Sequence, residues 1–123
     1  MKRTLMALAM IAAALVTSPT FGHGAKPQHG GDVVSANDLS YELVAEGTGA
    51  TIYVVDHDKP ADTSAMGGKL TVLNGSDKSE VDLKPAGGNK LEAKPVRLDK
   101  GAKAVASLAG PDGKVKTVRF SLR

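Results

Sequence analysis

The chain has 123 residues, of which 24% are charged and 3% aromatic, and it contains no cysteine. The lack of cysteine excludes a disulfide scaffold, a thiol nucleophile and a thiolate metal site. The formal net charge of +3 falls to +1 when Lys2 and Arg3 are removed with an N-terminal signal. Because the basic residues form no run with interleaved aromatics, the sequence shows no footprint for nucleic acid.

The first 22 residues have the pattern of a secretory signal peptide. Positively charged Lys2 and Arg3 precede an apolar run over residues 5–16. Small residues then occupy positions 20 and 22, Thr20 and Gly22, which are the two positions that a signal peptidase recognises. The alternative is a retained membrane anchor, for which the apolar run is too short. We therefore expect cleavage after Gly22, a periplasmic location and no insertion into the membrane afterwards.

Residues 23–30, with the sequence HGAKPQHG, follow the expected cleavage site. Their glycines, proline and histidines bury little apolar surface, so we expect a flexible arm ahead of a domain over residues 31–123. If His23 becomes the N-terminal residue, its α-amine and ring can both bind one metal ion, and His29 can fold back to the same ion. The alternative is a solvated linker that binds metal only incidentally.

The rest of the sequence is typical of short strands separated by turns. Residues 39–43 alternate apolar and polar positions, and the β-branched stretch over residues 50–55 indicates a central strand. Glycine, asparagine and proline mark turns between further strands, which we predict over residues 70–73, 81–83, 90–94, 102–109 and 115–122. The alanines of residues 102–109 would also suit a helix, but their alternation with other residues favours a strand.

About eight short strands at this spacing predict an all-β fold, namely a small antiparallel β-sandwich of Ig-like type. A chain of this length is sufficient for one domain with a single core. The alternation of the strands assigns that core to apolar side chains at Leu43, Ile52, Val54, Val72, Leu83, Phe120 and Leu122.

Signs of catalysis are lacking in the sequence. It contains no G-x-S-x-G motif, no P-loop and no dinucleotide-binding fingerprint. A triad of Ser64, His57 and Asp56 has no accompanying oxyanion hole. Glu80 and Asp82 share one exposed strand face, where solvated carboxylates are ordinary. We therefore predict that the protein is not an enzyme.

A second group of candidate ligands follows the strand over residues 50–55. His57 lies in a turn, and while the strand continues Asp56 and Asp58 point away from it. Met66 lies in the next loop. The alternatives are an exposed Asx-type turn for His57 and packing on the sandwich edge for Met66. Imidazole, amine and carboxylate ligands suit Cu(II), Zn(II) or Ni(II). We predict Cu(II) or Zn(II) as the cofactor, with a ligand set drawn from His23, His29, His57, Asp56 and Met66.

Three short stretches carry a resemblance to a known family: HGG at residues 29–31, YELV at 41–44, and IYVVD at 52–56 followed by Lys59 and Pro60. They resemble a small β-domain of the periplasmic adaptors, or membrane-fusion subunits, of RND-type heavy-metal efflux systems. The chain looks still more like small stand-alone exported β-domain proteins of proteobacteria. The resemblance covers residues 22–73 and implies a periplasmic metal-handling context, with His29 as the best-matched position.

The sequence also departs from the adaptor pattern. The adaptors' helical hairpin, lipoyl-like domain and barrel do not fit in 123 residues. Their usual glycine before Lys-Pro is replaced by Asp58. The transport mechanism therefore does not carry over to this chain.

Two functions are expected. The first is a periplasmic metal-binding module that buffers copper or zinc, or passes it to a heavy-metal efflux complex. The second is a non-enzymatic module that docks on another envelope protein, with incidental histidines. Metal titration separates the two.

Overall fold

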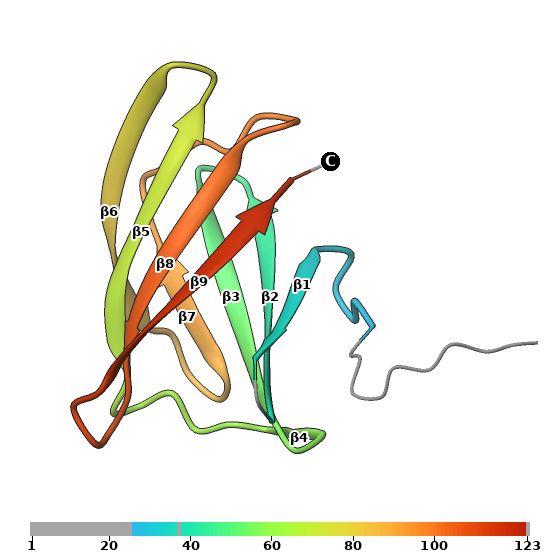
Figure 1. Ribbon diagram of the computed structural model, residues 1–123, viewed down its shortest axis with the longest axis vertical. Coiled ribbons are helices and arrows are strands. Elements are labelled where there is room, and N and C mark those ends of the chain that lie inside the picture. The colour runs from blue at the N-terminus through green and yellow to red at the C-terminus, as the bar shows by residue number, and fades with distance from the viewer. Residues whose placement is uncertain (1–25, 37, 123) are drawn as a thin grey trace, which may run out of the picture.

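The computed structural model describes residues 26–36 and 38–122, and all the regular structure in this part of the chain is β-strand (Figure 1). Nine strands follow in chain order: β1 (Asp32–Ala36), β2 (Leu39–Glu46), β3 (Gly49–Asp56), β4 (Lys59–Pro60), β5 (Gly67–Asn74), β6 (Asp77–Pro85), β7 (Lys90–Ala93), β8 (Lys103–Ala109) and β9 (Val115–Ser121). The described residues include no helix with the length and apolar character needed to cross a membrane. The expected signal peptide, its cleavage site and His23 lie outside them.

Hydrogen bonds join the strands into one antiparallel sheet in the order β1-β2-β3-β7-β6-β5-β8-β9, with β4 paired to β3. Strand β6 connects the two halves, because its first part pairs with β5 and its last two residues, Lys84 and Pro85, pair with β7. The sheet curls until it is nearly closed into a barrel (Figure 1). The predicted all-β antiparallel fold is confirmed, and the two faces of the expected sandwich are parts of one continuous sheet.

Strand β8 confirms the strand prediction for the alanine-rich segment. It pairs with β5 on one side and β9 on the other, so its backbone groups are satisfied by two neighbours. Ala104, Ala106 and Leu108 are buried and alternate with less buried residues. Small side chains at the first two positions leave room for larger ones from the facing strands, which explains why alanine occurs here in a strand.

The core is formed by inward-facing residues of alternate positions along the strands. Six of the seven predicted core side chains are buried, and they are Leu43, Ile52, Val54, Val72, Leu83 and Phe120. The seventh, Leu122, is partly buried and packs against the edge of the core. Tyr41, Leu70 and Leu91 are also fully buried. The period of two therefore identified the inward faces correctly.

Strand β1 was not among the predicted strands. It pairs with β2 from Asp32 opposite Leu43 to Ala36 opposite Leu39. The chain can approach β2 here because residue 31 is glycine, since a Cβ on Gly31 would lie 2.3 Å from the Leu43 carbonyl oxygen. A short five-residue strand with weak alternation gives little local signal, so its pairing partner decides its conformation.

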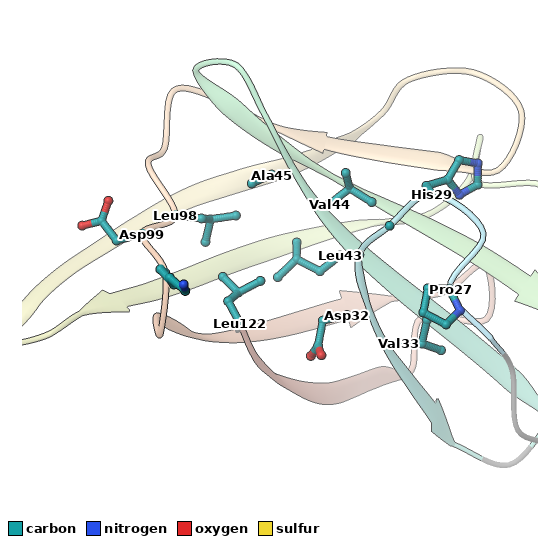
Figure 2. A pocket seen from close by; sticks show the side chains of 13 residues that line it. Pro27, His29, Asp32, Val33, Leu43, Val44, Ala45, Leu98, Asp99 and Leu122 are labelled. Carbon is teal, nitrogen blue, oxygen red and sulfur yellow. The ribbon is translucent and has the colours of Figure 1, made fainter.

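Strands β1 and β9 are the two edges of the sheet, and the gap between them is called the seam below. The Ser121 N–H donates to Asp32 Oδ2 at 3.1 Å across the upper end of the seam. No strand ladder joins β1 to β9 within the described residues. Toward the start of β9 the two strands diverge (Figure 1). One cavity beside the seam, shown in Figure 2, has Leu43, Leu98 and Leu122 on its wall.

Candidate functional site

The candidate site is built around Glu42, on the outer face of β2. Its neighbours along the strand face the core, yet Glu42 itself is only 5% exposed, because residues 28–31 fold over it. The carboxylate accepts three backbone hydrogen bonds, from the N–H groups of Gln28 (3.0 Å), His29 (2.8 Å) and Gly31 (2.7 Å). Glu42 therefore anchors the segment that precedes β1.

The hydrogen bonds determine the charge state of Glu42. Burial alone would raise the pKa of its carboxyl, but the hydrogen bonds from Gly31, Gln28 and His29 together outweigh burial, so the pKa is lowered. Gly30 has φ +77°, which turns successive N–H groups toward one anion in the manner of a backbone nest. Glu42 is therefore ionised at neutral pH and can only accept hydrogen bonds.

The ring of His29 is fixed on two sides. Its Nδ1 lies 3.1 Å from Glu42 Oε1, and the ring stacks on Tyr53 of β3 with centroids 3.6 Å apart and planes 4° from parallel. Because the Glu42 carboxylate only accepts, Nδ1 carries the proton, and Nε2 of the neutral ring keeps its lone pair. The His29 side chain is 42% exposed, and Nε2 lies on the side of the ring that faces away from buried Glu42.

A groove of about 540 Å³ runs beside His29 on this outer face. Apolar Val55 and Pro60 line it together with Lys26 and Asp58. Besides Glu42, Asp58 is the acidic side chain that the structure places in this groove. His29, Glu42 and Tyr53 come from the three stretches that carry the family resemblance, whereas Lys26, Gln28 and Asp58 lie outside them.

Residues 28–30 of the expected flexible arm contact β2. These residues are held against β2 through the hydrogen bonds of Gln28 and His29 to Glu42. Glycine and proline in a sequence indicate flexibility, but they do not reveal a buried carboxylate 13 residues away that accepts hydrogen bonds from the segment. The arm's first residues, 23–25, lie outside the described part of the chain.

His57 lies in the hairpin between β3 and β4. His57 (φ 53°) and Asp58 (φ 69°) form a two-residue loop between the paired residues Asp56 and Lys59, which is a type I′ turn rather than an Asx-type turn. The His57 N–H donates to the Asp38 carbonyl oxygen at 3.0 Å. The turn brings the Asp56 carboxylate back to His57 Nδ1, although a continued strand would separate the two side chains.

Asp38 completes the surroundings of this ring, and the sequence analysis did not single it out. Its Oδ2 lies 3.1 Å from His57 Nε2, so both ring nitrogens of His57 face carboxylates. The hydrogen bond to Asp56 and the charge of Asp38 raise the pKa of the exposed His57 ring above 6.5. The two carboxylates therefore favour the imidazolium, which is not a metal ligand.

We expect the His57 ring to titrate above pH 6.5 in an NMR titration, because a raised folded-state pKa means that the charged form is favoured in the fold. The resulting contribution to stability is fully present below pH 6.5 and is lost as the pH rises through the folded pKa. Asp56→Asn should lower the midpoint, and Asp38→Asn should lower it less. Asp58→Asn is the control and should leave the titration midpoint of His57 unchanged. A midpoint that changed in Asp58→Asn, but in neither Asp56→Asn nor Asp38→Asn, would contradict this assignment.

The structure separates the remaining predicted ligands. Met66 is partly buried against the core and shares a cavity with Asp56, whereas His29 lines the groove on the outer face. Within residues 26–36 and 38–122, no three histidine, aspartate or glutamate side chains form a group that could hold a metal ion. Among the predicted ligands that the structure describes, His57 and Asp56 are the pair in direct contact.

Glu42 and Tyr53 were not singled out as functional residues from the sequence. The only signal was that both lie in the stretches with a family resemblance, next to strand residues that the alternation assigns to the core. Comparison with protein-family models, with curated proteins and with solved structures finds no match to this chain.

Proposed function

We propose that this domain is an exported periplasmic module that binds Cu(II) or Zn(II) through Nε2 of His29. The orientation of the ring by Glu42 and Tyr53 is the observation that carries the proposal. Histidines that bind metal usually donate their other ring N–H to a carboxylate, which fixes the tautomer and makes the ligating nitrogen more basic. An imidazole ligand suits both ions.

The surroundings of His29 favour transfer of the ion over tight storage. Asp58 lines the same groove and is the second candidate ligand. Two protein ligands leave coordination positions open to water or to the ligands of another protein. Such a site suits a module that takes up the ion and passes it to a heavy-metal efflux complex, without catalysis.

The proposed ligand set is narrower than the one expected from the sequence. His57 is left out because both its ring nitrogens face carboxylates. Met66 and Asp56 are left out because they line a different cavity from His29. The proposal does not depend on His23.

Calorimetric titration of the purified protein at pH 7 tests the proposal. We expect His29→Gln to weaken binding of Zn(II) and Cu(II) by about tenfold or more, because it removes the ligating nitrogen itself. Loss of a group that only hydrogen-bonds to a metal ligand already costs about 10–100-fold in metal affinity. Glutamine retains a polar side chain of similar reach, so the fold should be preserved.

His57→Gln is the matched control, because it makes the same exchange at a histidine outside the proposed site. It should leave the affinity unchanged. Wild-type affinity for both ions in the His29→Gln variant would contradict the proposal. A loss seen only in His23→Ala would assign metal binding to the N-terminal histidine instead.

A second candidate function, docking on another envelope protein, is favoured by the seam. Strands β1 and β9 share no ladder among the described residues, and Leu98 and Leu122 lie beside the gap (Figure 2). Free strand edges pair with extended segments of other proteins. A complex that forms without metal, and equally well with His29→Gln, would favour this function.

A further inference from the structure

A second cavity lies at the wide end of the seam, away from the His29 groove. Its volume is about 360 Å³, within the range of small-molecule sites. Leu39 and Tyr41 from β2 and Val54 from β3 form one wall, and Met66 and Leu108 lie on it as well. The cavity therefore has mainly apolar walls.

The register of β2 and β3 explains why these side chains meet. Tyr41 lies opposite Val54, and Leu39 lies opposite Asp56, so all four belong to the inward face of the two strands. At Leu39 and Asp56 the two strands reach the end of the sheet, and on this side β9 has diverged from β1 (Figure 1). The last inward residues, Leu39 and Asp56, are consequently not fully buried at this end, whereas Tyr41 and Val54 behind them are.

The hydroxyl of Tyr41 is the unusual polar group of this cavity. Tyr41 is 1% exposed, and its hydroxyl forms no hydrogen bond with any residue that the structure describes. Asp56 lines the same cavity, and its Oδ1 is hydrogen-bonded to His57 Nδ1. Buried hydroxyl groups nearly always have a partner, so an unpaired one that lines a cavity marks a place where a bound molecule completes the site.

We propose that this cavity binds a small, uncharged, mainly apolar molecule that carries a carbonyl or ether oxygen, and that the Tyr41 hydroxyl donates a hydrogen bond to that oxygen. The cavity accommodates a body about the size of one ring with short substituents. This site is independent of His29 and of metal binding.

The charge state of the tyrosine and of the rim determines the chemical class of the ligand. Burial and then the charge of Asp56 raise the pKa of Tyr41, so the hydroxyl stays protonated and acts as a donor. Besides Asp56, the cavity is lined by charged side chains of both signs, namely Asp62, Asp112, Lys114 and Lys116. A rim of mixed charge favours neither an anion nor a cation, which leaves uncharged ligands.

Two fluorinated probes of nearly equal shape test the proposal by ¹⁹F NMR on the purified full chain. One is 4-fluoroacetophenone, which has a carbonyl oxygen, and the other is 1-ethyl-4-fluorobenzene, which has none. We expect Tyr41→Phe to weaken binding of the ketone by roughly 3–10-fold, the effect of one neutral hydrogen bond. Binding of the ethyl compound should not weaken.

Tyr53→Phe is the matched control, because Tyr53 lies on the outer face of β3 and does not line this cavity. It should leave both affinities unchanged. Without ligand, Tyr41→Phe should unfold at the same denaturant concentration as wild type or a higher one, because it removes an unpaired buried hydroxyl. A second variant, Met66→Phe, fills the cavity and should abolish binding of both probes.

Three outcomes would overturn the proposal. The first is that the ¹⁹F signals of both probes show no binding to the wild-type protein. The second is that Tyr41→Phe binds the ketone as tightly as wild type does. The third is that both probes still bind to a folded Met66→Phe variant, because they would then occupy another place.

Discussion

Phe120→Ala is expected to lower the free energy of unfolding by about 3–5 kcal/mol. Phe120 is 2% exposed and lies on β9, opposite Ala104 of β8. Its strand neighbour Val118 lies opposite Ala106. Alanine side chains cannot move into the space that the ring vacates, so the cavity stays largely open and the loss falls in this range for an aromatic truncation.

Urea unfolding followed by circular dichroism measures this loss as a lower midpoint with an unchanged slope. Val115→Ala is the matched control, since Val115 is an apolar residue of the same strand that is 65% exposed. It should change stability by no more than about 0.5 kcal/mol. A loss of under 1 kcal/mol for Phe120→Ala, well below the cost expected for a buried ring, would show that the edge strand β9 contributes little to the core.

Glu42→Gln is expected to cost about 1.5–3 kcal/mol at pH 7, the range for hydrogen bonds to a charged group. The carboxylate is 5% exposed and accepts three backbone hydrogen bonds in addition to its contact with His29. A glutamine amide would direct a donor at backbone donors and leave at least one of them unsatisfied. Hydrogen exchange should therefore accelerate at the N–H groups of Gln28, His29 and Gly31.

The pH dependence gives an independent check on Glu42. Its pKa is lowered in the fold, so the stability it contributes is present above the ordinary value of 4.5 and is lost as the pH falls through the folded pKa. Glutamine does not titrate, so the difference between wild type and variant should shrink in this acidic window. Glu80→Gln, at an exposed carboxylate on β6, is the control and should change little. An equal loss in both variants would contradict the anchoring role of Glu42.

Local patterns in the sequence were sufficient for the fold class. Alternation with a period of two is a property of each strand alone, so it identified the inward faces of β2, β3 and β9 without knowledge of their partners. The Asn74-Gly75 turn and the turns at Gly101 and Gly113, before and after β8, also act locally, through backbone dihedral angles. Strand β1 lacked such a signal, because its conformation depends on pairing with β2.

The sites, in contrast, depend on residues that are distant in sequence. Glu42 has the alternation of an exposed strand residue, and only the fold of residues 28–31 over β2 makes it a buried anchor for His29. Asp38 reaches His57 because Leu39 at the start of β2 pairs with Asp56 at the end of β3, so the residues just beyond the two strands are neighbours.

The cavity at Tyr41 shows the same division. The inward orientation of the Tyr41 side chain follows from the sequence, because the alternation of β2 is a local property of that strand. The lack of a partner for the Tyr41 hydroxyl among the described residues follows from the tertiary structure, because β9 diverges from β1 (Figure 1) and only Leu39 and Asp56 separate Tyr41 and Val54 from the end of the inward face. The sequence by itself thus determined the strands and their buried faces, which are set by backbone geometry and local polarity. The tertiary structure alone decided which polar groups meet, because hydrogen-bond partners are set by strand register and chain reversal.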